Sequence, residues 1–122
     1  MIPELVDLSE APWRVLPRGL HWATLAEVEF VFAQNPHRRK LFMGLRNAAM
    51  SLKLAGCRYL FIDGSYVTAK PNPSDFDGCW APEGVTKALL DPVLLDFSNS
   101  RRNQKLKYYG ELFPSTALAS PG

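Results

Sequence analysis

The sequence predicts a small mixed β-sheet flanked by helices, a fold of the α/β class and more narrowly of the α+β kind. Two segments, residues 24–34 and 36–55, carry apolar residues at helical spacing. Two shorter runs, Tyr59–Ile62 and Asp75–Trp80, have the composition of strands and are separated by a loop that contains Pro and Asn. The 122 residues suit a single domain, 1–122, that buries about two-thirds of its unfolded surface.

The composition is that of an ordinary globular protein, with 47% apolar and 21% charged residues. A net charge of +2 is too small to argue for nucleic-acid binding by itself. No apolar run approaches the roughly 20 residues of a membrane-spanning helix, so we expect no membrane partner. Cys57 and Cys79 form neither a C-x-x-C motif nor a zinc-binding pattern, and two lone cysteines favour a reducing, cytoplasmic location.

Residues 1–22 are expected to form a Pro-rich arm that lies against the body of the domain, because their three prolines leave no room for a long helix. Thr24 and Glu27 then have the spacing of a capping box, in which each side chain accepts a hydrogen bond from the other residue's backbone. The first helix is expected to run from this box to about Gln34.

The second helix is predicted to begin at about Pro36, a tolerated residue in a first helical turn, and to end at Gly56 in a left-handed cap. A strand follows over residues 58–63. The basic segment His37–Lys40 lies at the start of the second helix, where the helix macrodipole disfavours cations. It is interpreted either as a contact for phosphate or as a solvated turn, and the solvated turn is favoured.

The stretch from Gly64 to Asp77 predicts a metal–nucleotide site. Asp75 and Asp77 are two residues apart, so in an extended segment both carboxylates project to one face while Phe76 turns into the core. Neighbouring carboxylates repel each other unless a cation lies between them, and Mg²⁺ takes carboxylate and phosphate oxygens. Gly64 and Ser65 follow the apolar run and offer backbone N–H groups and a hydroxyl to a phosphate. The alternative is a surface loop followed by two solvated aspartates.

The Gly-Ser pair, the nine residues after it and the Asp-x-Asp pattern resemble the signature of the DNA polymerase β-type nucleotidyltransferase superfamily, and most of all its minimal members. The run Phe61–Thr68, with Lys70-Pro71 and Pro73–Asp75, is similar to an uncharacterised bacterial and prophage branch of that superfamily. The resemblance extends over residues 17–114, although the arginine-glycine pattern that is more familiar in this loop is absent.

The resemblance implies a metal-dependent nucleotidyltransferase that moves a nucleoside monophosphate from an NTP to a hydroxyl of a protein or an RNA. Asp75 and Asp77 would be catalytic and would bind Mg²⁺ or Mn²⁺, while Gly64, Ser65 and Lys70 would bind the nucleotide's phosphates. Minimal members also occur in toxin–antitoxin or phage-defence loci, so a toxin or antitoxin is an expected protein partner. The alternative function is an antitoxin-type binding module that has the same fold and a catalytically reduced site.

A third acidic residue belongs to the pattern, on a strand beside the Asp-x-Asp strand, and two candidates exist. In one interpretation residues 93–97 form a strand that carries Asp96. In the other, Asp91 caps a helix that runs through residue 107 and is ended by Gly110, and the strand after it, residues 111–113, carries Glu111. We favour Glu111 as the third catalytic acid, because Tyr108–Phe113 looks like the helix end and strand that carry this residue in similar proteins.

The remaining C-terminal features are a short helix, a basic helix and a tail. A short helix is expected over residues 85–90, and residues 115–122 read as a flexible tail. Four cations lie within seven residues of the predicted last helix: Arg101, Arg102, Lys105 and Lys107. They would contact a triphosphate or an RNA backbone, or else form a solvated helix face, which is the favoured interpretation.

Overall fold

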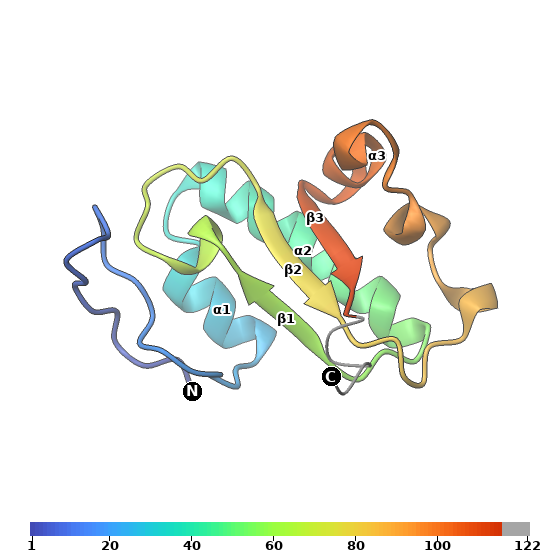
Figure 1. Ribbon diagram of the computed structural model, residues 1–122, viewed down its shortest axis with the longest axis horizontal. Helices are drawn as coiled ribbons and strands as arrows, with labels where there is room; N and C mark the ends of the chain where they lie inside the picture. The colour runs from blue at the N-terminus through green and yellow to red at the C-terminus, as the bar shows by residue number, and fades with distance from the viewer. Residues whose placement is uncertain (116–122) are drawn as a thin grey trace.

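A three-stranded mixed sheet lies at the centre of the computed structural model, which describes residues 1–115 (Figure 1). The strands are β1, Leu60–Asp63, β2, Phe76–Trp80, and β3, Gly110–Pro114. β2 is the central strand and pairs antiparallel with β1 and parallel with β3. This arrangement confirms the predicted α+β fold with a small mixed sheet, and both expected early strands are neighbours in it.

Two helices precede the sheet, and in Figure 1 α2 lies behind it while α1 lies beside β1. Helix α1, Leu25–Phe32, begins at the predicted capping box, since both hydrogen bonds between Thr24 and Glu27 are present. Helix α2, Pro36–Leu54, begins after Asn35, whose side chain accepts a hydrogen bond from the backbone of the first turn. The chain then turns away at Gly56, which has the expected positive φ of 100°.

The core lies between α2 and one face of the sheet. Residues of β2 alternate between buried and partly exposed, with Phe76, Gly78 and Trp80 on the buried face. That face packs on the apolar side of α2. The intervening residues Asp77 and Cys79 therefore project to the opposite face, which α1 and α2 leave open in Figure 1. The core residues from α2 and the two strands include Leu41, Leu45, Ala48, Leu52, Phe76, Trp80 and Leu112.

The N-terminal arm contains no helix and lies against the domain, as predicted. Val15 forms an isolated antiparallel bridge with Val6 and another with Thr68, in the loop after β1. The Ala69 backbone N–H donates a hydrogen bond of 2.8 Å to the Arg14 carbonyl. Figure 1 shows this arm on the β1 side of the sheet and α3 on the β3 side.

The chain between β2 and β3 is helical, so the interpretation of residues 93–97 as a strand is wrong. Asp91 caps a 3₁₀ helix, Pro92–Leu95, and α3 follows over Ser98–Tyr108. The two helical pieces are separated by Asp96 and Phe97. Residues 99–101, at the start of α3, have φ between 51° and 61°, in the left-handed region. Gly110 was expected to end the helix, but Tyr109 takes the left-handed position and Gly110 is already the first residue of β3.

Smaller corrections concern the turn after β2 and the tail. The short helix expected over residues 85–90 is a 3₁₀ turn, Lys87–Leu89. Ser115 was included in the expected tail, but it is 5% exposed and its N–H donates to the Trp80 carbonyl. The rest of that expected tail, residues 116–122, lies outside the described residues. Within residues 1–115, no helix combines the length and the apolar character that a membrane span requires.

Candidate metal centre

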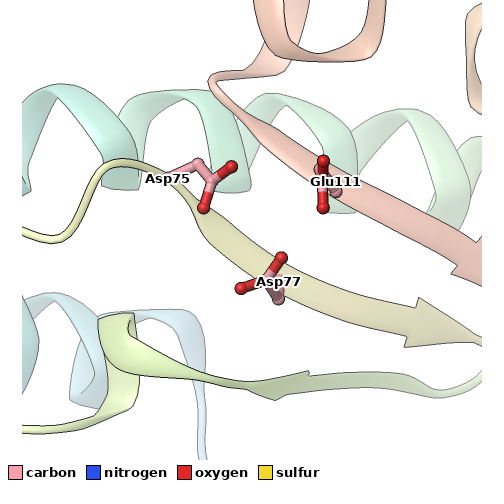
Figure 2. Close-up of side chains that lie close together, drawn as sticks. All are labelled: Asp75, Asp77 and Glu111. Carbon is pink, nitrogen blue, oxygen red and sulfur yellow. The ribbon is translucent and has the colours of Figure 1, made fainter. Parts of the chain in front are cut away.

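Three carboxylates converge on the open face of the sheet, those of Asp75, Asp77 and Glu111 (Figure 2). One oxygen of each lies within 4.8 Å of the corresponding oxygens of the other two. Figure 2 shows Asp75 just before β2, Asp77 within β2 and Glu111 on β3, with their side chains gathered above the same part of the sheet. Sequence reasoning had singled out all three residues, and the fold brings them together.

The sheet register explains this convergence. Asp77 and Glu111 are directly paired across the parallel strands β2 and β3, so their side chains point to the same face. Asp75 immediately precedes β2 and lies two residues from Asp77, which places it on that face as well. Phe76 between them is fully buried in the core, as the alternation predicts. The acidic cluster is thus a direct product of strand geometry.

The two aspartates lie in an electrostatically unfavourable environment. Burial and the neighbouring carboxylates of Asp75, Glu111 and Asp63 raise the pKa of Asp77 to about 6. The pKa of Asp75 is also raised, mainly by burial and to a smaller extent by the Glu111 carboxylate. Asp63 takes part because it is the β1 residue paired with Asp77 across the antiparallel edge. A cation placed among these oxygens would relieve the repulsion that adds to burial in raising both pKa values.

Glu111 differs from the aspartates because it has cationic partners from α3. One of its oxygens, Oε1, accepts hydrogen bonds from Arg101 at 3.0 Å and from Lys105 at 2.9 Å. Burial alone would raise the pKa of Glu111, but the bonds to these two side chains hold it below its ordinary value. Two of the four cations in the basic helix therefore face the acidic cluster rather than solvent alone. The favoured solvated-face interpretation misses that contact.

Gly64 and Ser65 adjoin the acidic cluster. A Cβ at Gly64 would lie 2.7 Å from Oδ2 of Asp77, and Gly64 has a positive φ of 77°, so only glycine fits this turn without displacement. Ser65 begins a 3₁₀ helix, Ser65–Val67. Its hydroxyl has no hydrogen-bond partner within residues 1–115. The Gly-Ser turn thus lies against the carboxylates and has a free hydroxyl.

The Lys70 side chain lies against the N-terminal arm and not beside the carboxylates. Its ammonium lies 5.3 Å from the ring centroid of Trp13, in the N-terminal arm. Its backbone carbonyl accepts hydrogen bonds from the guanidinium of Arg38. The cations that act on the acidic cluster are instead Arg101 and Lys105.

Arg38 is a residue that sequence reasoning misread, since it is neither a solvated turn nor a phosphate ligand. It is 4% exposed, and its guanidinium donates to backbone carbonyls of the loop that follows β1. These acceptors are Tyr66 at 2.8 Å, Thr68 at 2.7 Å and Lys70, with a fourth at Phe32. The sequence did contain one signal for this role. Arg38 lies in the first turn of a helix, where the macrodipole disfavours a cation, so a compensating contact for its guanidinium was to be expected.

Asp96, the other candidate for the third acid, belongs to a local turn. Its carboxylate accepts hydrogen bonds from Ser98 and Asn103, and these bonds lower the pKa of Asp96. It is absent from the group of acidic ligands identified within the described residues, which contains Glu111. The geometry therefore favours Glu111 as the acid that accompanies the Asp-x-Asp pair.

The donor set suits a hard divalent cation. All three groups are carboxylates, the ligands that Mg²⁺ and Mn²⁺ prefer over the nitrogen and sulfur ligands of zinc. One oxygen of each lies within 4.8 Å of the others, and oxygens on opposite sides of one Mg²⁺ lie about 4.2 Å apart, so a small closure of the cluster would bring all three onto one ion. Within residues 1–115, neither Asp75 nor Asp77 forms an ion pair with a cationic side chain. The residues present therefore fit a metal.

Residues 10–121 match the model of a family of unknown function (DUF6932). No curated protein and no solved structure shows significant similarity to the chain.

Proposed function

The chain belongs to DUF6932, a family of unknown function, and we propose from the geometry of its carboxylates that it is a metal-dependent nucleotidyltransferase. The observation that carries this proposal is the convergence of Asp75, Asp77 and Glu111. A relationship to the DNA polymerase β-type nucleotidyltransferases is part of the proposal. A cytoplasmic location is another part, and the free thiols of Cys57 and Cys79 support it.

In this proposal Asp75 and Asp77 hold Mg²⁺ or Mn²⁺. When bound, the ion would activate an acceptor hydroxyl and offset the charge of the triphosphate. The proximity of Gly64 to Asp77 supports a role for the Gly-Ser turn in holding the nucleotide's phosphates beside the carboxylates. Lys70 is the weaker phosphate ligand, since its ammonium faces Trp13. Arg101 and Lys105 are better placed to contact phosphate oxygens, because they already lie beside the cluster.

The proposed reaction transfers a nucleoside monophosphate. The acceptor's hydroxyl oxygen attacks the α-phosphorus of an NTP and forms a new P–O bond. The bond between the α-phosphorus and the bridging oxygen to the β-phosphorus breaks, and pyrophosphate leaves with that oxygen. The hydroxyl proton passes to Glu111, the carboxylate of the cluster that does not hold the metal in this proposal. The acceptor is a protein or an RNA, and a toxin or antitoxin partner encoded in the same locus is a candidate.

One observation favours a second function, that of an antitoxin-type binding module. Glu111 is already neutralised by Arg101 and Lys105, so one of the three acids is satisfied without a metal. A site in which this pairing persists would hold a cation less tightly. The chain would then act through its surface on a protein partner and not through transfer.

The test is label transfer from each of the four NTPs, labelled on the α-phosphate, with Mg²⁺ or Mn²⁺ and host lysate. We expect label on one macromolecular species with the wild-type protein and none with Asp75→Asn. Glu111→Gln should reduce transfer about a hundredfold or more, the scale for losing an acid–base group. The matched control Asp96→Asn removes a carboxylate outside the cluster and should change transfer little.

Three outcomes would contradict the assignments. Transfer that survives Glu111→Gln and disappears in Asp96→Asn would show that the third acid is Asp96. Equal Mn²⁺ affinity of the wild type and Asp75→Asn, measured by calorimetry, would reject Asp75 as a ligand. Tight binding of a protein partner that is unchanged by all three substitutions, with no transfer by the wild type, would favour the binding module.

A further inference from the structure

A cavity of about 320 Å³ lies along the outer edge of β1. The N-terminal arm forms one wall with Trp22, α1 forms another with Val28 and Phe32, and β1 forms the third. Its volume lies at the lower end of the range found for small-molecule sites. In Figure 1 the arm and α1 both lie on the β1 side of the sheet, away from α3.

Asp63 connects the lining of the cavity with the acidic cluster. Asp63, the last residue of β1, lines the cavity and is paired with Asp77 across the antiparallel strands. Paired residues of this kind have Cβ atoms about 5 Å apart, so a ligand bound at Asp77 can extend past Asp63 into the cavity. Gly64, which contacts Asp77, directly follows Asp63. One nucleotide-sized ligand can therefore occupy both places.

The lining of the cavity suits a flat ring. Trp22 is 64% exposed, and its ring centroid lies 6.5 Å from that of Phe61, with the two planes inclined by 52°. The indole therefore has free surface beside the cavity on which another ring can stack. The Asp63 carboxylate at the rim would repel a phosphate, so the neutral end of a nucleotide is the part that suits this position.

The backbone of β1 adds polar groups along the same wall. Ala81 donates to the Tyr59 carbonyl, so residues 59, 61 and 63 direct their hydrogen-bonding groups toward β2. By the alternation of antiparallel ladders, the N–H and C=O groups of Leu60 and Ile62 point to the outer edge. Both residues line the cavity, and neither has a backbone bond beyond the sheet within residues 1–115. An edge with adjacent donor and acceptor groups matches the edge of a nucleobase.

We propose that this cavity binds the base of the nucleotide whose phosphates lie at Asp75 and Asp77. The base stacks on Trp22 and places its polar edge against the free backbone groups of Leu60 and Ile62. This inference rests on the proposed function, because it takes the ligand of the acidic cluster to be a nucleotide. It adds a base-binding site built by the N-terminal arm.

The test compares the affinity of Mg²⁺-bound NTPs with that of Mg²⁺-bound inorganic triphosphate, which has no base. Calorimetry on the full chain would measure the dissociation constants of ATP, GTP, CTP, UTP and triphosphate. The variant is Trp22→Ala, and the matched control is Phe30→Ala, which removes an aromatic ring that is 79% exposed on α1 and does not line the cavity.

We expect at least one NTP to bind about tenfold or more tightly than triphosphate. Trp22→Ala should raise the dissociation constant of that NTP about tenfold, the scale of one base stacked on an aromatic side chain. It should leave the affinity for triphosphate unchanged. Phe30→Ala should leave both affinities unchanged. Circular dichroism would verify that Trp22→Ala is folded, as the exposure of this side chain leads us to expect.

The two proposals fail in different ways. If Trp22→Ala binds the NTPs as the wild type does, or if no NTP binds more tightly than triphosphate, the base site is overturned. Loss of triphosphate binding in Asp75→Asn would then still support the metal–phosphate site. If Trp22→Ala weakens NTP binding while Asp75→Asn does not, the cavity binds the base and the metal ligands are wrongly assigned. If the wild type binds neither NTP nor triphosphate, both proposals are overturned.

Discussion

Asp77 faces three other carboxylates, those of Asp75, Glu111 and Asp63, and has no cation bonded to it within residues 1–115. Burial and this repulsion raise its pKa from 3.8 to about 6. The folded protein therefore holds the Asp77 proton more tightly than the unfolded chain does. The resulting stabilisation is fully present below pH 3.8 and is lost as the pH rises through about 6.

We predict that, with EDTA present, the wild-type free energy of unfolding falls between about pH 5 and about pH 7.5 because Asp77 loses its proton in that range. Asp77→Asn should show a smaller fall, since the amide does not titrate. Urea denaturation at the two pH values would measure both differences. The control Asp96→Asn should keep the wild-type difference, because the pKa of Asp96 is lowered and lies outside that range. The same pH dependence in wild type and Asp77→Asn would contradict the electrostatic description of the cluster.

At the scale of elements, the start of α2 holds the loop that joins β1 to β2. Asn35 donates to the Pro71 carbonyl, a ring nitrogen of His37 bonds the Pro73 carbonyl, and Arg38 donates to carbonyls between Tyr66 and Lys70. The Arg38 guanidinium also lies 5.2 Å from the centroid of the Tyr66 ring. The loop that separates the Gly-Ser turn from Asp75 is therefore anchored by one helix end.

We predict that Arg38→Ala lowers the free energy of unfolding by more than about 3 kcal/mol, because it leaves several buried carbonyl groups without a donor at about 1–3 kcal/mol each. The neighbouring Arg39→Ala removes an exposed cation of the same helical turn and should cost less than about 0.5 kcal/mol. Denaturant unfolding of both variants measures the difference. Similar stability of the two variants would mean that Arg38 does not hold the loop.

At the scale of the whole molecule, the N-terminal arm is an integral part of the domain. Its residues Ile2, Leu5 and Leu16 pack against the hydrophobic core, and Val15 pairs with Thr68 in the anchored loop. The arm also forms one wall of the cavity beside β1. The fold therefore depends on contacts of the N-terminal arm with the core and with the loop after β1, as well as on the sheet.

Removal of residues 1–22 should destabilise the protein by about 2–4 kcal/mol, since each partly buried aliphatic side chain contributes about 1 kcal/mol or more. Thermal unfolding of the truncated and full chains would measure the loss. Arg18→Ala changes an exposed residue of the arm and should leave the transition unchanged. An unchanged transition in the truncated chain would show that the arm does not contribute to the core.

Local sequence determined the early helices, the strands and the acidic pair. The capping box at Thr24, the left-handed Gly56 and the Asp-x-Asp pattern each act over a few residues, so their geometry follows from short-range sterics and hydrogen bonding. Strand alternation likewise predicted that Phe76 is buried between Asp75 and Asp77. These features need no knowledge of distant residues.

Only the tertiary structure decided which distant groups join the cluster. Glu111 faces Asp77 because of the parallel register of β2 and β3, whereas Asp96, equally acidic in the sequence, bonds to Ser98 and Asn103. The buried position of Arg38 also depends on a loop about 30 residues away along the chain. Periodicity describes which face a side chain takes within its own element. It does not describe the pairing of elements, because burial, register and charge contacts between them arise only when the chain has packed.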